Sequence, residues 1–266
     1  MFPFRPPPDG FELVLPLAGG PYFHVLLVTR GDVRHVAKRP SPRFADDPRG
    51  ARMVANEASA LRRLAGRGAP TLVATGDDAH GAYLVTDWIE GMSLSSFVHD
   101  ALLFRARARA VFAALAEIHA HGVVHGDPSL TNILVTKGRE PRALFLDFGL
   151  SRLTVDGRSE GDGAFAGTLA YAAPEVAISG GRASSFASDV FATAAVLVHH
   201  FSGEAPRPSL TTPALLVHAA EIPIDGTALE ALIPELGRAL APEPERRPTA
   251  PELAARLRGS GELDPP

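Results

Sequence analysis

The chain has 266 residues, 45% of them hydrophobic and 21% charged, which is enough for two lobes with a substantial core and is ordinary for a globular protein. Its net charge of −4 argues against a general nucleic-acid binder, which needs a basic surplus to neutralise phosphates. The absence of cysteine excludes disulfides, thiolate metal sites and cysteine nucleophiles. We find no membrane-spanning apolar run and no signal peptide, so we expect a cytoplasmic protein without a membrane partner.

The first third of the chain predicts a small β-rich part. Residues 1–10 are proline-rich and predict an extended N-terminal tail. A run of apolar residues at helical spacing predicts a helix over 51–64, preceded by a loop over 40–50. Segments rich in Val, Leu and aromatic residues predict strands at 11–17, 22–29, 33–38, 71–75 and 82–88.

After Gly91 the pattern becomes helical. Residues 149–174 are rich in Gly and Ser and predict a long loop, which is usually functional or disordered. The predicted helices cover 94–99, 101–121, 186–201, 228–240 and 249–257, and a strand pair covers 133–136 and 143–146. We therefore expect two lobes, residues 11–89 and 90–259, followed by a tail at 260–266. Ligands favour the cleft between such parts.

Two acidic clusters carry the chemistry. His125 to Asn132 has the form H-x-D-x-x-x-x-N, and Asp147-Phe148-Gly149 follows it closely. Asp127 can orient a hydroxyl group, while Asn132 and Asp147 offer the oxygen ligands that Mg²⁺ prefers. The order and spacing of the two clusters favour ATP-dependent phosphoryl transfer.

Two residue types are conspicuously scarce. Lysine occurs only at Lys38 and Lys137, asparagine only at Asn56 and Asn132, and glutamine is absent. Where almost every basic position is Arg, a remaining Lys can be one that is needed as a compact ammonium group. Lys38 ends a predicted strand and could hold the α- and β-phosphates, with Glu57 of the next helix to aim it.

These motifs resemble those of the protein kinase superfamily, and the similarity to bacterial Ser/Thr kinases runs from about Phe11 to Leu257. The resemblance implies an α+β, bilobal fold with a β-rich N-lobe and a helical C-lobe. The segments that carry it, besides the two clusters, are His35 to Lys38 (the V-A-I-K strand), Tyr83 to Gly91 (the hinge), Ala173-Pro174-Glu175 (A-P-E), Ser188-Asp189-Val190 and Glu245 to Thr249.

The resemblance also implies roles for individual residues. The cofactors would be ATP and Mg²⁺ or Mn²⁺, with Asp127, Lys38, Asn132 and Asp147 catalytic and Asn132 and Asp147 holding the metal. The nucleotide would be bound by Gly20, Val25, Ala37, Lys38, Glu57, the gatekeeper Thr86, the backbone of Asp87 and Ile89, and Leu134. Structural support would come from His125, Asp189, Thr168 next to Asp127, and a Glu175–Arg247 ion pair.

The sequence departs from the family pattern in the glycine loop. Only Gly20 keeps a family glycine, because Ala18 and Phe23 occupy the other two positions. Glycine lets the backbone approach a phosphate closely, so Phe23 should restrict the loop.

The catalytic loop also departs from the pattern. Gly126 replaces the Arg that usually precedes the catalytic Asp (a non-RD kinase), and Ser129 and Thr131 stand where compensating cations would be expected. A phosphate on Thr154 or Ser159 would lack its usual ligand, so we predict basal activity without activation-loop phosphorylation.

The leading hypothesis is an ATP-dependent Ser/Thr protein kinase whose partners are ATP and a protein substrate. His-Gly-Asp loops also resemble those of aminoglycoside, choline, sugar and lipid kinases, so a small-molecule kinase is one alternative. A pseudokinase that acts as a nucleotide-binding interaction module is another, favoured by the weak glycine loop and by Ser129.

Overall fold

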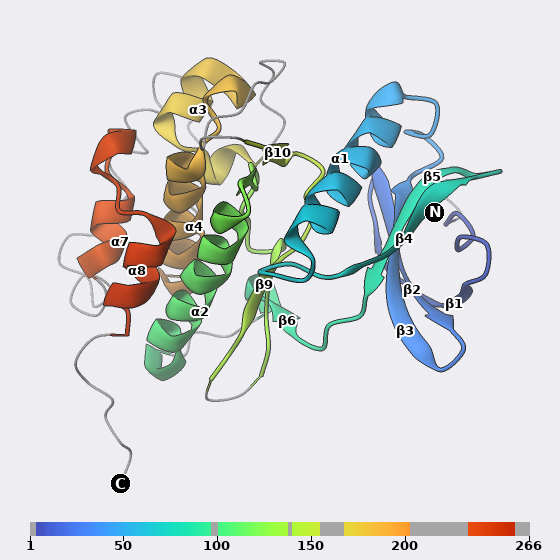
Figure 1. The fold of residues 1–266 in the computed structure, drawn as a ribbon, viewed down its shortest axis with the longest axis horizontal. Coiled ribbons are helices and arrows are strands. Elements are labelled where there is room, and N and C mark those ends of the chain that lie inside the picture. Colours follow the sequence, from blue (N-terminus) through green and yellow to red (C-terminus); the bar gives the residue numbers. More distant parts are fainter. Residues whose placement is uncertain (1–3, 97–100, 138–139, 155–167, 203–233, 259–266) are drawn as a thin grey trace, which may run out of the picture. The chain divides into compact units, whose positions relative to one another are not determined.

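The computed structural model describes residues 4–96, 101–137, 140–154, 168–202 and 234–258 (Figure 1). The chain divides into two compact units. Unit 1 contains the described residues up to Glu90 together with residues 147–151, and unit 2 contains the remainder. The predicted lobe boundary at 89 and 90 lies one residue from this division. Residues 147–151, which we predicted in the helical part, belong instead to unit 1 because they bond to its helix.

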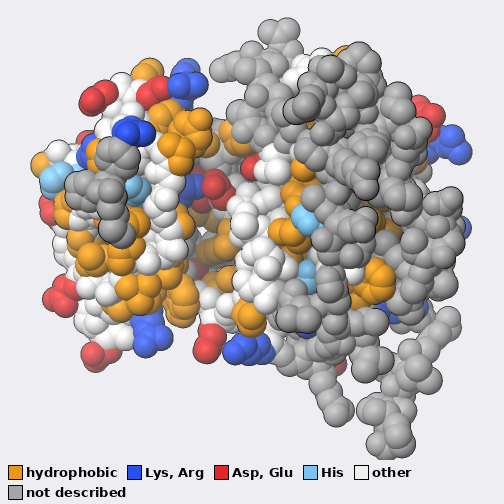
Figure 2. Space-filling view, turned by 180° about the vertical axis from the view of Figure 1, so that it is seen from behind, with side chains coloured by type: hydrophobic (Ala, Val, Ile, Leu, Met, Phe, Trp, Pro, Cys, Tyr) orange, Lys and Arg blue, Asp and Glu red, His pale blue; other side chains and the backbone are white. Residues whose placement is uncertain are grey.

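Unit 1 is built on one antiparallel sheet with the strand order β1-β2-β3-β5-β4 (Figure 1). Its strands are β1 (Glu12–Gly19), β2 (Phe23–Arg30), β3 (Val33–Pro40), β4 (Leu72–Asp78) and β5 (Gly81–Asp87). All five were predicted from their Val, Leu and aromatic content. β1 is an edge strand, and its large apolar side chains are exposed, as the apolar surface of this unit in Figure 2 illustrates.

The two faces of this sheet carry different side chains. Residues that are direct partners in an antiparallel ladder point to the same face. One face, here called the Lys38 face, carries Val25, Leu27, Val36, Lys38, Leu84 and Thr86. The opposite face, here called the Ala37 face, carries His24, Leu26, Val28, His35, Ala37, Arg39 and Val85. A hydrophobic cluster of Phe11, Leu26, Val28, Ala37 and Val85 fills the centre of the Ala37 face.

The N-terminal segment lies on the Ala37 face, whereas we predicted it as a tail. The Phe4 ring stands 4.7 Å from that of His24, and the Arg5 backbone N–H donates to His24 Nδ1. Arg39, which is 1% exposed, donates to the Pro6 carbonyl at 3.0 Å and pairs with Asp78 at 2.5 Å. Residues 4–10 are held because the buried Arg39 guanidinium needs acceptors that the segment supplies.

Helix α1 (Pro48–Leu64) packs against β3, β4 and β5. It begins three residues before the predicted start, because Asp47 caps it by accepting the Arg49 N–H and Pro48 occupies the first turn. Val54, Glu57, Ala58 and Leu61 are buried at the spacing of one helical face. This spacing fixes Glu57 on the packed side of the helix.

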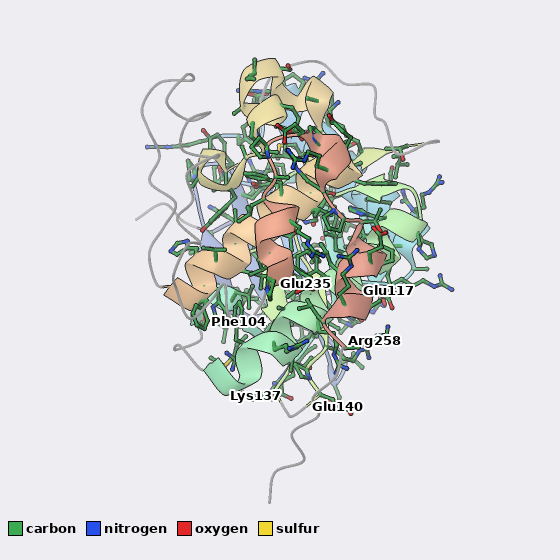
Figure 3. All side chains as sticks on the ribbon, turned by 90° about the vertical axis from the view of Figure 1, so that its left-hand side faces the viewer. Phe104, Glu117, Lys137, Glu140, Glu235 and Arg258 are labelled. Atoms are coloured by element: carbon green, nitrogen blue, oxygen red, sulfur yellow. The ribbon has the colours of Figure 1, made fainter. Side chains whose placement is uncertain are left out.

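Unit 2 contains two small antiparallel sheets. One has the order β6-β8-β9, with β6 (Met92–Ser93), β8 (Ile133–Val135) and β9 (Ala143–Phe145); the other pairs β7 (Val123–Val124) with β10 (Arg152–Leu153). Both sheets frame the catalytic loop, which runs from the end of β7 to the start of β8. Lys137, the second lysine, is exposed just after β8 (Figure 3).

The helices of unit 2 surround α2, which packs against α4 and α8. Phe104 of α2 is labelled in Figure 3; its ring lies 4.8 Å from that of Phe201 on α4. The helices and helical turns are η1 (Leu94–Ser96), α2 (Ala101–Ala120), η2 (Leu169–Tyr171), α3 (Pro174–Ser179), η3 (Gly180–Ala183), α4 (Phe186–Ser202), α7 (Pro234–Ala239), η4 (Pro244–Arg246) and α8 (Ala250–Arg256).

The predicted α+β class is confirmed. Parts of the predicted helices at 94–99 and 228–240, half of the predicted loop at 149–174 and the predicted C-terminal tail lie outside the described residues. Within the described part of the chain, no helix combines the length and apolar character needed to cross a membrane.

Candidate active site

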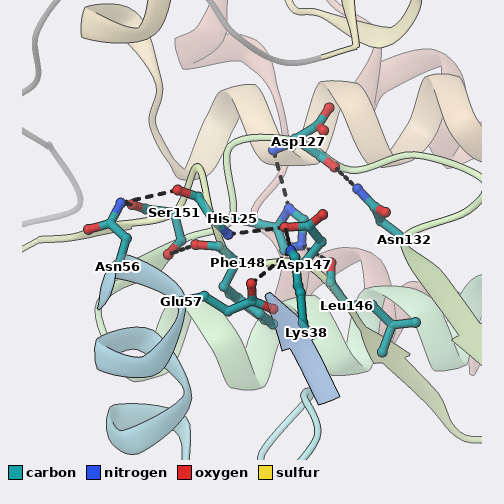
Figure 4. Close-up of polar contacts among 11 residues, drawn as sticks. Lys38, Asn56, Glu57, His125, Asp127, Asn132, Leu146, Asp147, Phe148 and Ser151 are labelled. Carbon is teal, nitrogen blue, oxygen red and sulfur yellow. Dashed lines mark hydrogen bonds and ion pairs between the residues drawn. The ribbon is translucent and has the colours of Figure 1, made fainter. Parts of the chain in front are cut away.

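A buried charge cluster lies in unit 1 (Figure 4). Lys38 Nζ is 2.8 Å from Glu57 Oε2 and 2.5 Å from Asp147 Oδ1. The Lys38 and Glu57 side chains are 9% and 7% exposed, whereas that of Asp147 is 43% exposed. Strand β3, helix α1 and the D-F-G segment therefore meet at one ammonium group, with one carboxylate buried behind it and one partly open to solvent.

The cluster shifts the pKa values of its buried members. Burial alone would lower the pKa of Lys38, but the charges of Glu57 and Asp147 and their hydrogen bonds outweigh it, so the pKa rises. Burial also raises the pKa of Glu57, and repulsion from Asp147 adds to the effect, although Lys38 opposes both. Two carboxylates share one ammonium group, so the cluster holds an excess negative charge that a cation near Asp147 would relieve.

The alternation of strand β3 corrects one predicted residue. We predicted that Ala37 packs on the adenine ring, but adjacent strand residues point to opposite faces. Ala37 is 1% exposed inside the cluster of the Ala37 face, away from Lys38. Val36, which we did not predict, lies on the Lys38 face, where its ladder partners on the neighbouring strands are Leu27 and Thr86. The predicted residues Val25 and Thr86 lie on that same face.

The glycine loop joins β1 to β2. The Gly20 N–H donates to the Phe23 carbonyl at 3.0 Å, which closes the turn, and space remains at the Gly20 Cα position for a Cβ. Phe23, at a position where the family has glycine, places its ring 4.8 Å from Lys38 Nζ. An aromatic face attracts a cation at this distance, so Phe23 covers the ammonium group that would bind phosphate.

The predicted hinge residues lie at the end of unit 1. The Asp87 N–H donates to the Thr71 carbonyl at 3.1 Å. The Asp87 backbone could therefore contact adenine only through the Asp87 carbonyl, which would accept a hydrogen bond. Ile89 follows β5 and is half-buried, and the predicted adenine contact Leu134 is half-buried on β8 of unit 2.

Asp127 lies in the catalytic loop of unit 2. Its Oδ1 accepts the backbone N–H of Thr168 at 2.7 Å, so the predicted Thr168 contact is made by the backbone. Asn132 donates from Nδ2 to the Asp127 carbonyl at 3.1 Å (Figure 4). That bond leaves the amide oxygen as the acceptor end of Asn132.

His125 and Asp189 hold the backbone of this loop. The Asp189 carboxylate, 1% exposed, accepts the N–H groups of His125 and Gly126 at 2.7 and 2.9 Å. His125 Nδ1 lies 3.2 Å from the Asp127 N–H and Nε2 lies 3.0 Å from the Leu146 carbonyl. An N–H partner requires an accepting Nδ1, and a carbonyl requires a donating Nε2, so both ring nitrogens of His125 bind backbone groups and the ring supports the loop.

The positions without the expected cations serve the loop itself. Ser129 is 5% exposed, and its Oγ accepts the Asn132 N–H at 3.3 Å and contacts Thr131 Oγ1 at 3.1 Å. Gly126 has φ of 84°, a backbone conformation that strains most other residues. The Ser129 hydroxyl and the backbone freedom of Gly126 therefore both suit the local geometry of the turn.

A bidentate ion pair joins Glu175 of α3 to Arg247. The two guanidinium nitrogens lie 2.7 and 2.8 Å from the two carboxylate oxygens, and the Arg247 side chain is fully buried. Arg247 also donates to the carbonyls of Ala187, Ala241 and Pro242. This is the fork-shaped geometry in which Arg is hard to replace.

The residues predicted to hold Mg²⁺ suit that ion chemically. Asn132 offers an amide oxygen, and Asp147 offers a carboxylate that already neutralises Lys38. Mg²⁺ takes oxygen ligands and is commonly held by one or two carboxylates together with substrate phosphates.

A small pocket lies next to Asp127 in unit 2. Its walls include Thr168 and Tyr171, the small residues Ala172 and Ala173, and Val176. Ser184, Ser188 and Asp189 also line the pocket, so its walls are partly polar.

These groups would suit phosphoryl transfer, a reaction that needs a cation for the phosphates, oxygen ligands for Mg²⁺ and a carboxylate that can orient a hydroxyl group. Comparison with known proteins agrees. The family model described as a protein kinase domain matches residues 19–256. The chain belongs to the protein kinase domain family.

Several curated relatives carry protein kinase names. The probable serine/threonine-protein kinase PkwA of Thermomonospora curvata is 30% identical over 93% of this chain and 34% of its own length. Serine/threonine-protein kinase PknB of Mycolicibacterium smegmatis is 32% identical over 66% of this chain and 30% of its own. The lectin-domain containing receptor kinase VI.4 of Arabidopsis thaliana is 30% identical over 79% of this chain and 32% of its own length. The chain thus spans about a third of these relatives.

Proposed function

We propose that this chain is an ATP- and Mg²⁺-dependent protein kinase that transfers the γ-phosphate of ATP to a Ser or Thr hydroxyl of a protein. The observation that carries the proposal is the Lys38–Glu57–Asp147 cluster, in which two carboxylates hold the Lys38 ammonium group in one direction. The Ser/Thr kinase names of the bacterial relatives support the choice of acceptor.

In the proposed reaction, Lys38 binds the α- and β-phosphates while Glu57 fixes its direction. Bound Mg²⁺, held by Asn132 and Asp147, would neutralise charge on the phosphates. Asp127 orients the acceptor hydroxyl and takes up its proton, and the Thr168 N–H keeps one of its oxygens in place. Positioning and charge supply most of the catalysis in this type of reaction.

A protein acceptor is favoured over a small molecule by the segment that follows the catalytic loop. The Glu175–Arg247 pair anchors α3, and the residues before α3 line the pocket next to Asp127.

The test is the substitution Asp127→Asn. Asn keeps an oxygen that can accept the Thr168 N–H but loses the charge, so the variant should fold and bind MgATP. We expect transfer of ³²P to a generic protein substrate to fall by about 10²-fold or more. Thermal shift with MgATP checks binding separately.

The alternatives give different results in the same experiment. ATP turnover with a metabolite or antibiotic, but no labelled protein, would point to a small-molecule kinase. The pseudokinase alternative predicts no transfer by the wild-type chain. Unchanged transfer by the Asp127→Asn variant would refute the assignment of Asp127.

A further inference from the structure

One face of helix α1 contacts the D-F-G segment through three residues. Met53, Asn56 and Glu57 are spaced i, i+3 and i+4, so they lie on the same side of the helix. Glu57 pairs with Lys38 and accepts the Phe148 N–H. A Cβ built on Gly149 would lie 3.1 Å from Met53 Cε, which shows how closely helix and segment approach.

Asn56 makes the contacts that the predicted roles did not include. Its Nδ2 donates to the Ser151 carbonyl at 2.9 Å and to the Gly149 carbonyl at 3.3 Å (Figure 4). Both acceptors are carbonyl oxygens, so the group that contacts them has to be a donor, and an NH₂ group has one hydrogen for each. Asparagine has such a group, which fixes the orientation of its amide.

The segment that Asn56 holds is a tight turn. Ser151 donates from both its N–H and its Oγ to the Phe148 carbonyl, at 3.0 and 2.6 Å. Asp147, at the start of the turn, has φ of 61°, which is uncommon for a residue other than glycine and needs surrounding contacts to persist. Asn56 supplies two such contacts at the far end of the turn.

A purely helical reason for Asn56 is weak. Asn56 is itself largely exposed to solvent although its amide contacts the D-F-G segment, and within a helix asparagine is a poorer helix former than alanine. The chain has only two asparagines and no glutamine, and the other asparagine lies in the catalytic loop. The contacts to residues 149 and 151 explain the residue better than helix stability does.

We propose that Asn56 is a positioning residue that fastens the Asp147–Ser151 turn to helix α1, so that Asp147 stays within reach of Lys38 without a phosphate on the activation segment. The role rests on the proposed kinase function. Asn56 acts through Asp147 and does not itself need to touch ATP.

The decisive variant is Asn56→Asp, which keeps the shape but turns a carboxylate oxygen toward two carbonyl oxygens. Asn56→Ala removes the donors without adding repulsion and favours the helix. We expect kcat/KM for ATP to fall roughly 5- to 100-fold in both, more in Asn56→Asp, as two hydrogen bonds are lost. Ala55→Asn, on the exposed side of the same helix, is the matched control and should leave kcat/KM unchanged.

Two readouts separate positioning from general damage. The Mg²⁺ concentration for half-maximal activity should rise in the Asn56 variants, because Asp147 is held less firmly, while the KM for the protein acceptor should not change. The melting temperature of Asn56→Ala should stay close to that of the wild type, because the higher helix propensity of alanine offsets part of the loss of the two hydrogen bonds. Kinetics within twofold of the wild type, or losses that only follow a fall in melting temperature, would overturn the proposal.

Hydrogen exchange distinguishes this proposal from failure of the kinase assignment. Amides of residues 148–151 should exchange faster in Asn56→Asp than in the wild type, whether or not the protein transfers phosphate. Active wild type with unchanged exchange overturns the positioning role and leaves the kinase function standing. If the wild type is inactive and residues 148–151 still exchange faster in Asn56→Asp, the Asn56 contact is real but its role in catalysis is overturned.

Discussion

In unit 1 the functional side chains hold one another directly, whereas in unit 2 they are held through the backbone. Lys38 binds both Glu57 and Asp147, so charged side chains of the cluster contact one another directly. The backbone of the catalytic loop is instead held by a buried carboxylate, Asp189, which accepts two backbone N–H groups. Removal of one partner should therefore leave an unpaired charge in unit 1, whereas in unit 2 it should leave unpaired backbone N–H groups.

The difference matters because the catalytic loop lacks the cations of many protein kinases. Gly126, Ser129 and Thr131 serve the local geometry of the turn. Charge that would steer phosphate is concentrated in unit 1, at Lys38. In the proposed mechanism, the charge cluster and Asn56 therefore organise the site.

The largest effect should come from Lys38→Met, which leaves the buried Glu57 carboxylate without its ammonium partner. Breaking a buried pair costs about 3–5 kcal/mol of stability, and transfer should fall by about 10²-fold or more. The double variant Lys38→Met/Glu57→Gln should recover much of the stability but none of the activity. Lys137→Ala, at the exposed lysine, is the control.

Thermal melting and ³²P transfer on the four proteins decide this prediction. If the double variant melts as low as Lys38→Met, the unpaired charge is not the source of instability, and the contrast between the two units loses its basis.

A smaller effect is expected from Phe23→Gly. The substitution restores a family glycine and removes the aromatic ring that covers Lys38. A cation–aromatic contact of about 0.5–1 kcal/mol would be lost from the ATP-free state, so the KM for ATP should fall by roughly two- to fivefold. Steady-state kinetics at varied ATP measure the change, and Tyr22→Gly, at the neighbouring exposed residue, is the comparison. A higher KM in Phe23→Gly would mean that the ring assists ATP binding.

Much of the fold and part of the site could be predicted from the sequence. Strands, and helices such as α2 and α4, follow from local apolar patterns, and the motif spacing brings Glu57 to Lys38. The start of α1 was missed because Asp47-Pro48 is also typical of a loop. The prediction that Ala37 binds the nucleotide was wrong because it ignored that successive residues of β3 point to opposite faces of the sheet, which puts Ala37 and Lys38 on different faces.

The remaining contacts depend on residues far apart in the chain. Nothing near Pro6 indicates that its carbonyl binds Arg39, and nothing near Asn56 indicates that it reaches residues 149 and 151. Only the scarcity of asparagine marked Asn56 as unusual. Such contacts become visible when tertiary packing is known.

The smallest effect, none at all, is expected from removal of phosphate. Thr154, one of the two predicted phosphate sites, is 5% exposed, and its N–H donates to the Gly122 carbonyl at 2.8 Å, so it is poorly placed for modification. The other, Ser159, lies outside the described residues.

The central claim is that the charge cluster and Asn56 organise the site without an activation-loop phosphate. The most direct test is the initial rate of ³²P transfer to protein by phosphatase-treated chain, with its phosphate-free state verified by intact mass. We predict the same rate as for untreated chain. A large loss on treatment that is restored by rephosphorylation would contradict the account.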